Sequence, residues 1–223
     1  MLYRKSKKIL IYFFLFLLIG TLNNKNLSNF DLMRLDKIIV NGLDEKNNFE
    51  INKTINSLNE KNLFFLNKLQ IEDVINSNNL VEKFYVFKHY PSTLIIKIDK
   101  TKFLAQIKND HGNFFLGSNG KLIKSSKAER DVPFIFGKFE NKNFFELKKA
   151  IDETNFEYTK IKNLFFFKSG RWDIETKNGV LIRLPEDNVK KSLELINIFF
   201  IKQKEEKIYK IDLRQKNQII ING

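Results

Sequence analysis

The sequence predicts an α+β protein with an N-terminal single transmembrane helix, a small strand–helix–helix–strand–strand domain, and a mostly antiparallel β domain with two helices. Three observations lead to this prediction. A basic start precedes an uncharged apolar run, two segments with helical apolar spacing lie between short strands, and alternating apolar runs separated by Gly-containing turns fill the second half. We expect a cytoplasmic tail (1–8), a transmembrane signal anchor (9–22), a linker (23–36) and two domains (37–104 and 105–223).

Composition argues against several functional classes. The chain of 223 residues has no cysteine, which excludes disulfides, thiolate metal sites and cysteine nucleophiles. Its formal charge of +13 comes from scattered lysines, and we attribute it to an overall bias towards Lys, Asn, Ile and Phe rather than to a nucleic-acid-binding patch. The two histidines, His89 and His111, lie in or beside predicted turns, and the sequence has no hydrolase, nucleotide-binding or metal-binding motif. We therefore expect a protein that is not an enzyme and uses no cofactor.

The N-terminus has the charge pattern of a membrane anchor. Four cations within residues 4–8 precede an uncharged apolar run at 9–22. Positive charge before the run predicts a cytoplasmic N-terminus and places residues 25–223 outside the cytoplasm. The run has 14 residues, against the roughly 20 of a full span. Snorkelling by Lys7 and Lys8, local thinning of the bilayer or partial burial of Asn23 and Asn24 would cover the gap.

The predicted span includes Ile9, Leu15 and Leu22. A cleaved signal peptide is the alternative, because an apolar core of this length also fits one. Residues 20–28 contain no alanine to serve a cleavage site, so we favour an uncleaved anchor.

The first domain is organised around a predicted hairpin at 80–98. Its turn is Tyr90-Pro91-Ser92, where proline fixes its own φ and biases the residue before it away from helix. Apolar residues fall on both alternating sets of the hairpin, so we expect both faces to contact other parts of the structure. A short strand at 37–40 and two helices precede it, the first capped by Asn47 or Asn48 and the second at 69–77.

The second domain alternates strands and turns. We expect hairpins around residues 109–113 and 169–170, helices at 144–154 and 188–204, and a closing strand at 218–222. Trp172, the single tryptophan, is predicted to lie in the core rather than in a binding platform.

Residues in both domains resemble the FtsQ/DivIB family of bacterial cell division proteins, whose first domain is a POTRA domain. The matching stretches are Ile39–Gly42, Asn62–Phe64, Val81 with Val86, Pro91–Leu94, Val132–Gly137, Ile211–Arg214 and the pattern W-x-I-x-x-x-N-G-x-x-I-x-L-P at 172–185. The chain departs from the family pattern at Lys100 and Phe103, where Glu and Pro are usual, and at Gln215, where an aromatic is usual.

The resemblance implies a non-enzymatic division scaffold of the inner membrane that links early and late division proteins at the septum and regulates septal peptidoglycan synthesis. It also implies that the last strands bind the partner FtsB, which pairs with FtsL, by β-strand addition. Carried onto this chain, the candidate partner-binding residues are Arg214, Gln215, Asn217, Gln218, Ile219, Ile220, Ile221, Lys168 and Arg171. The POTRA domain would help recruitment to the division site.

Two other functions remain open from the sequence. A POTRA-containing factor of outer-membrane protein assembly or secretion would need a following membrane barrel or tandem repeats, and the residues after 104 offer room for neither. An anchored hydrolase would need a clustered nucleophile and base, which the sequence pattern does not supply. The plain alternative for the last strand is that it only closes the sheet.

Overall fold

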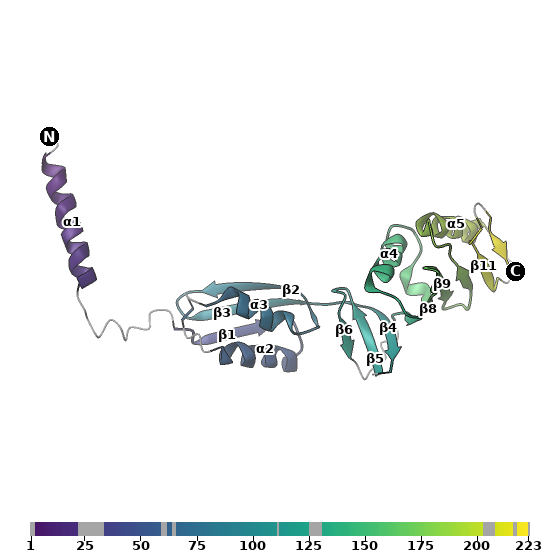
Figure 1. Ribbon diagram of the computed structural model, residues 1–223, viewed down its shortest axis with the longest axis horizontal. Coiled ribbons are helices and arrows are strands. Elements are labelled where there is room, and N and C mark those ends of the chain that lie inside the picture. Colours follow the sequence, from purple (N-terminus) through teal and green to yellow (C-terminus); the bar gives the residue numbers. More distant parts are fainter. Residues whose placement is uncertain are drawn as a thin grey trace.

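The computed structural model describes residues 3–21, 34–58, 62–63, 66–110, 112–124, 131–202, 208–215 and 218–222. Within this part of the chain an N-terminal helix is followed by two sheets, each with its own helices, which lie one after the other (Figure 1). The two units are α+β, as predicted. Leu22, His111 and Asn217 lie outside the described residues, as does most of the predicted linker.

The first unit is a three-stranded sheet with two helices packed on it (Figure 1). In chain order it contains β1 (Lys37–Asn41), α2 (Glu45–Ser57), α3 (Lys68–Asn76), β2 (Val81–His89) and β3 (Thr93–Lys100). Strand β3 is central, parallel to β1 and antiparallel to β2. The buried core that joins the helices to the sheet consists of Val40, Ile51, Ile55, Leu63, Leu66, Ile71, Ile75, Val81, Leu94, Ile96 and Ile98.

Only one face of this sheet is covered within the described residues. Leu94 and Ile96 of β3 are fully buried under the helices, whereas Tyr85 and Phe87 of β2 point the other way and are 51% and 49% exposed. The expectation that both faces of the hairpin contact other parts of the structure is therefore wrong for this part of the chain. The alternation of apolar and polar residues along a strand predicts which side chains share a face of the sheet, but not whether another element covers that face.

Helix α2 begins earlier than predicted because the cap is Asp44 and not Asn47 or Asn48. The Asp44 side chain accepts a hydrogen bond from the Asn47 backbone nitrogen at 3.3 Å. The preceding turn depends on Gly42, whose φ is +121° and whose Cβ position would lie 1.7 Å from the Ile98 oxygen. No other residue type fits this close approach.

The second unit is a nine-stranded mixed sheet in the order β12-β11-β10-β9-β8-β7-β4-β5-β6. Five of its eight pairings are antiparallel, and β10–β11, β4–β7 and β7–β8 are parallel. Its elements are β4 (Phe103–Asn109), β5 (Gly112–Gly117), β6 (Leu122–Lys124), β7 (Phe134–Phe136), α4 (Asn141–Asp152), the 3-10 helix η1 (Tyr158–Lys160), β8 (Ile161–Phe166), β9 (Trp172–Thr176), β10 (Leu181–Arg183), α5 (Val189–Lys202), β11 (Lys210–Asp212) and β12 (Ile220–Ile221).

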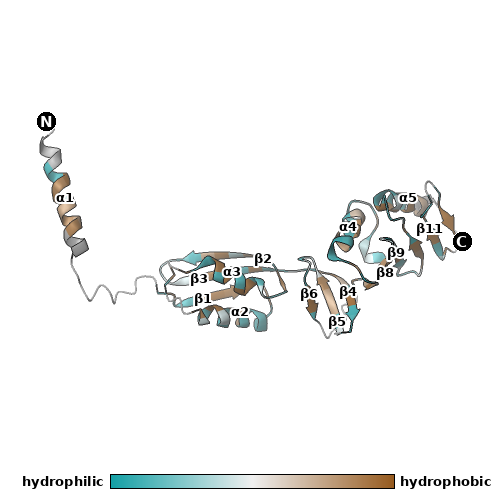
Figure 2. Cartoon of the chain, viewed as in Figure 1, coloured by the Kyte–Doolittle hydropathy of each residue, from teal (hydrophilic) through white to brown (hydrophobic). Residues whose placement is uncertain are grey.

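Helices α4 and α5 contact each other and share one core with the sheet. Trp172 lies in that core and is 4% exposed. Its ring centroid is 4.7 Å from that of Phe166 and 5.8 Å from that of Phe139. The hydropathy colouring places apolar residues along the strands of both sheets (Figure 2).

The predicted transmembrane helix is wrong. Helix α1 (Tyr3–Thr21) forms, but among the described residues no helix has the length and apolar content to cross a membrane. The physical reason lies in its first turns, because the helix includes the cations of residues 4–8 and the apolar stretch that follows is short. Ile9 and Leu15 lie in α1, with exposed fractions of 68% and 49%.

A polar junction joins the two units at the turn between β5 and β6. Asn119 Nδ2 donates to the main-chain oxygens of Asn79 at 2.9 Å and Val81 at 2.8 Å. Lys121 Nζ donates to the main-chain oxygen of Asn76 at 2.6 Å. The Asn119 Oδ1 atom accepts from the Lys121 nitrogen at 3.0 Å, which holds the turn in shape.

A carboxylate from β2 completes this junction. Glu82 Oε2 accepts from Ser118 Oγ at 2.7 Å and from Thr101 Oγ1 at 2.9 Å. The family that the sequence resembles usually has a glutamate where this chain has Lys100. The acid comes instead from the neighbouring strand.

Candidate functional site

Among the described residues, strand β12 forms one open edge of the nine-stranded sheet. It is shorter than the predicted 218–222 strand and pairs with β11, where Asp212 lies opposite Ile220. The Asn222 nitrogen donates to the Lys210 oxygen at 2.9 Å. Because hydrogen-bonded pairs alternate along an antiparallel ladder, the Asp212–Ile220 pair is also a bonded one. The backbone N–H and C=O of Ile221 therefore point away from β11, towards the open edge.

The side chains of this edge differ in burial. Ile219 is half-buried and packs against the main core, and Ile221 is half-buried as well. Ile220 is 37% exposed, and Gln215 and Gln218 are exposed. The edge thus combines an anchored apolar strand with polar side chains in solvent.

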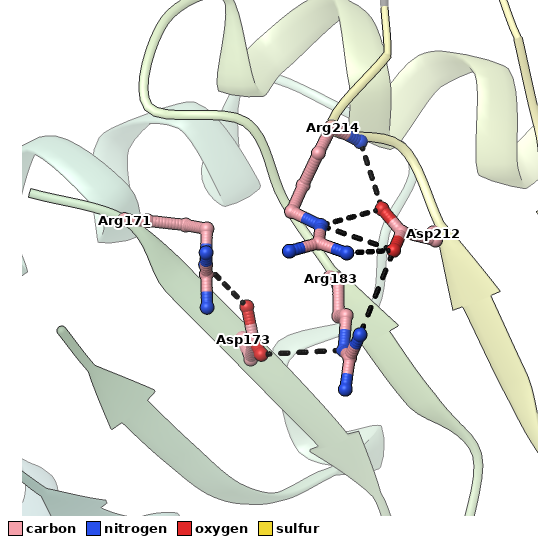
Figure 3. A network of polar contacts seen from close by, with 5 residues as sticks. All are labelled: Arg171, Asp173, Arg183, Asp212 and Arg214. Atoms are coloured by element: carbon pink, nitrogen blue, oxygen red, sulfur yellow. Dashed lines mark hydrogen bonds and ion pairs between the residues drawn. The ribbon is translucent and has the colours of Figure 1, made fainter. Parts of the chain in front are cut away.

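A ladder of alternating charges lies beside the edge, on β9, β10 and β11 (Figure 3). Arg183 on β10 is the central cation, placed opposite Asp173 on β9 and Asp212 on β11. Its guanidinium atoms lie 3.9 Å from Asp173 Oδ2 and 3.7 Å from Asp212 Oδ2. At one end of the ladder Arg171 Nε lies 3.2 Å from Asp173 Oδ1, and at the other end Arg214 Nη2 lies 2.5 Å from Asp212 Oδ2.

The two acids of the ladder have opposite pKa shifts. Hydrogen bonds from Arg214 lower the pKa of Asp212 below its ordinary value. Burial raises the pKa of Asp173, although Arg171 and Arg183 oppose that rise. Asp173 is 4% exposed. The charged form of Asp212 is therefore well stabilised, whereas burial disfavours the charged form of Asp173.

The ladder has unused hydrogen-bonding capacity. Arg183 Nε is buried and has no hydrogen-bond acceptor among the described residues. Arg171, Arg183 and Arg214 pair with only Asp173 and Asp212 (Figure 3), so the ladder carries a net positive charge. A carboxylate brought to this surface would meet guanidinium groups already held in place.

Lys168 and Arg171 lie at different places relative to this ladder. Arg171 belongs to it and also lies over the Phe167 ring, 4.3 Å from guanidinium carbon to centroid. Lys168 lies in the exposed turn between β8 and β9. Of the predicted cations, Arg171 and Arg214 are thus joined through Arg183, which the sequence reasoning did not single out.

A hollow of about 520 Å³ adjoins the edge on the side of α5. Arg214, Gln215 and Gln218 line it from the sheet side, and Lys191 and Leu195 line it from the helix. Its helix-side residues were also absent from the sequence candidates, because their proximity depends on where α5 crosses the sheet.

The described part of the chain offers no cluster of three or more His, Asp or Glu side chains suited to a metal ion. His89 lies at the exposed end of β2. The groups gathered here suit binding: an open backbone edge, a cationic ladder and an adjoining hollow.

The element order of the first sheet, followed by a long mixed sheet, defines a two-domain protein of the POTRA-bearing class. Residues 33–100 match the family model for the FtsQ-type POTRA domain, and residues 105–214 match that for the C-terminal domain of the cell division protein FtsQ/DivIB. The chain belongs to the FtsQ/DivIB family of cell division proteins.

Individual relatives are distant in sequence. The chain is 23% identical over 194 residues to the cell division protein FtsQ of Rickettsia bellii, covering 84% of this chain and 72% of that protein. It is 22% identical over 161 residues to FtsQ of Bradyrhizobium diazoefficiens, covering 68% and 45%. The major extracytoplasmic domain of DivIB from Geobacillus stearothermophilus matches with a TM-score of 0.35 and 14% identity, over 48% of this chain and 99% of that one.

Proposed function

We propose that this protein is a non-enzymatic scaffold of the cell division machinery that binds an FtsB/FtsL-type partner at its β12 edge. The partner contributes a strand that pairs with the backbone groups of Ile221, and the complex links early and late division proteins and regulates septal peptidoglycan synthesis. We place the two sheet units on the periplasmic side, at the inner membrane of the division site. Membership of a cell division family supports this choice.

The observation that carries the proposal is the open edge itself. An unpaired edge offers a row of donors and acceptors, and strand addition satisfies them at little cost in rearrangement. The half-buried Ile219 packs against the core just before β12, so the edge is already in a strand conformation before a partner arrives. Pre-organisation of this kind lowers the entropic cost of binding.

The charge ladder supports the same proposal and gives the partner its chemistry. Arg171 and Arg214 each keep part of their guanidinium in solvent, with side-chain exposures of 23% and 42%. An acidic side chain flanking the added strand would pair with one of them. Gln215 and Gln218 supply further hydrogen bonds at the rim of the adjoining hollow.

The test is co-purification of FtsB- and FtsL-type proteins with the full chain and with Ile221→Pro. Proline at 221 removes the outward N–H, and edge positions tolerate it. The matched control is Lys124→Pro at the opposite edge of the same sheet. There, the Gly117 nitrogen donates to the Lys121 oxygen at 3.0 Å, so by the same alternation the N–H of Lys124 also points outward.

The proposal requires loss of the partner with Ile221→Pro and its retention with Lys124→Pro, both with unchanged circular dichroism. Equal recovery by both variants would remove β12 from the interface. A second pair, Arg214→Gln and Lys168→Gln, separates the ladder from the exposed turn. We expect a larger loss of binding for Arg214→Gln, because only Arg214 lies beside both the edge and the hollow.

A further inference from the structure

The uncovered face of the first sheet carries lysines and aromatic rings together. Tyr85 and Phe87 of β2 project from it, and Lys97 of β3 lies opposite Tyr85 in the register. Lys97 Nζ is 5.7 Å from the centroid of the Phe87 ring. Lys37 and Lys83 occupy outward positions on the flanking strands and are exposed.

Charge is divided unevenly between the two sides of this domain. Residues of a strand alternate between the two faces of a sheet, so the uncovered face carries Lys37, Lys83 and Lys97 together with one acid, Asp99, which lies opposite Lys83 in the register. Helices α2 and α3, on the other face, carry three lysines and four acids. The uncovered face is therefore cationic and the helix side slightly anionic.

The tip of the β2–β3 hairpin lies where the chain enters the domain from α1. The backbone nitrogens of Asp36 and Lys37 donate to the Ser92 oxygen at 3.0 and 3.2 Å. Tyr90, at the same tip, is 50% exposed. Helix α1 itself presents exposed apolar side chains along residues 9–17, between 47% and 74% exposed.

We propose that this lysine–aromatic face docks on an anionic lipid surface through Lys37, Lys83, Tyr85, Phe87, Tyr90 and Lys97. Ammonium groups attract the phosphates of anionic headgroups, and tyrosine and phenylalanine rings are stable at the boundary between headgroups and acyl chains. An acidic protein is the competing occupant. Lipid is favoured because Phe87 and Tyr90 are exposed near the hairpin tip that the backbone of Asp36 and Lys37 contacts, and because the preceding helix α1 also presents exposed apolar side chains. The inference uses a different domain from the β12 edge and does not depend on the partner proposed there.

Binding of the full chain to vesicles tests the charge requirement. Wild type is compared with Lys37→Gln/Lys83→Gln/Lys97→Gln and with a matched control, Lys46→Gln/Lys53→Gln/Lys68→Gln, which removes the three helix-side lysines. Vesicles are phosphatidylcholine alone or phosphatidylcholine with phosphatidylglycerol. Since each lysine near an anionic surface contributes about a fivefold gain in partitioning, we expect a loss on the order of 100-fold for the sheet variant on anionic vesicles. The control should change severalfold at most.

A site-specific readout separates this face from α1, which is common to all variants. The chain has no cysteine, so Ser92→Cys at the hairpin tip and Ser77→Cys at the C-terminal end of helix α3 each take a single polarity-sensitive dye. We expect a blue shift at 92 with anionic vesicles, none at 77, and no shift at 92 in the sheet variant. A dye at 92 that stays in water on anionic vesicles, or equal losses for the two triple variants, would overturn the proposal and leave an acidic protein as the occupant.

Discussion

Replacing Asn119 by alanine should weaken the coupling between the two sheet units. The Asn119 side chain donates to the Asn79 and Val81 oxygens and accepts from the Lys121 nitrogen. At about 1 kcal/mol for each hydrogen bond, the full set contributes about 3 kcal/mol. Asn119 lies in a turn and water can reach part of the site, so we expect a loss of about 2 kcal/mol in the free energy of unfolding.

The assay is urea denaturation of the full chain followed by two probes. Trp172, the single tryptophan, is buried in the second unit and reports its unfolding through fluorescence. Far-ultraviolet circular dichroism reports both units. If the junction couples them, the two curves coincide for wild type and separate for Asn119→Ala, with one midpoint lowered by about 1 M urea for a slope of about 2 kcal/mol/M.

The matched variant is Asn119→Asp, which keeps the acceptor for Lys121 but loses both donated bonds. We expect it to behave like the alanine variant, because the lost bonds are those that cross between the units. Coincident curves and an unchanged midpoint for Asn119→Ala would refute the reasoning. So would a normal curve for Asn119→Asp.

Three further outcomes follow from the packing and the charge ladder. Hydrogen bonds from Arg214 lower the pKa of Asp212, so the stability that its charge contributes is present at pH 7 and is lost as pH falls from about 4 through the lower pKa of the folded state. Asp212→Asn should therefore be less stable at pH 7 and show a smaller fall in melting temperature on acidification. Trp172→Ala should cost about 3–5 kcal/mol in a urea titration read by circular dichroism, because it empties a buried site. Gly42→Ala should lower the melting temperature markedly, since its methyl group would meet the Ile98 oxygen and φ is +121°; an unaltered melting curve would contradict the turn geometry.

The sequence predicts those parts of the fold that depend on local pattern. The hairpin around Pro91, the core position of Trp172 and the two long helices of the second unit follow from apolar spacing and turn residues. The cap of α2 was misplaced because Asp44 and the nearby asparagines are all good caps in sequence. The prediction of a transmembrane helix was wrong for a different reason. Helix α1 includes the cations of residues 4–8 in its first turns, and these lower the apolar content of the helix below what a membrane span needs.

The site is less predictable because its geometry is non-local. Arg183 gains its two acidic neighbours only through the antiparallel β9–β10 and parallel β10–β11 pairings. Nothing in the spacing of Asp173 and Asp212 reveals that they flank one guanidinium. The strand register likewise decides which backbone groups of β12 point away from β11. It identifies the N–H and C=O of Ile221, rather than those of Ile220, as the outward groups.

The junction has a consequence for sequence divergence. Asn119 and Lys121 donate to main-chain oxygens of residues 76, 79 and 81, and every amino acid carries such an oxygen. Substitutions at those acceptor positions therefore preserve the bonds, whereas the donor side chains have few replacements. The orientation of one domain on the other can therefore be retained when the exposed acceptor residues change, whereas Val81 is also fixed by its place in the core and Glu82 by its side-chain bonds.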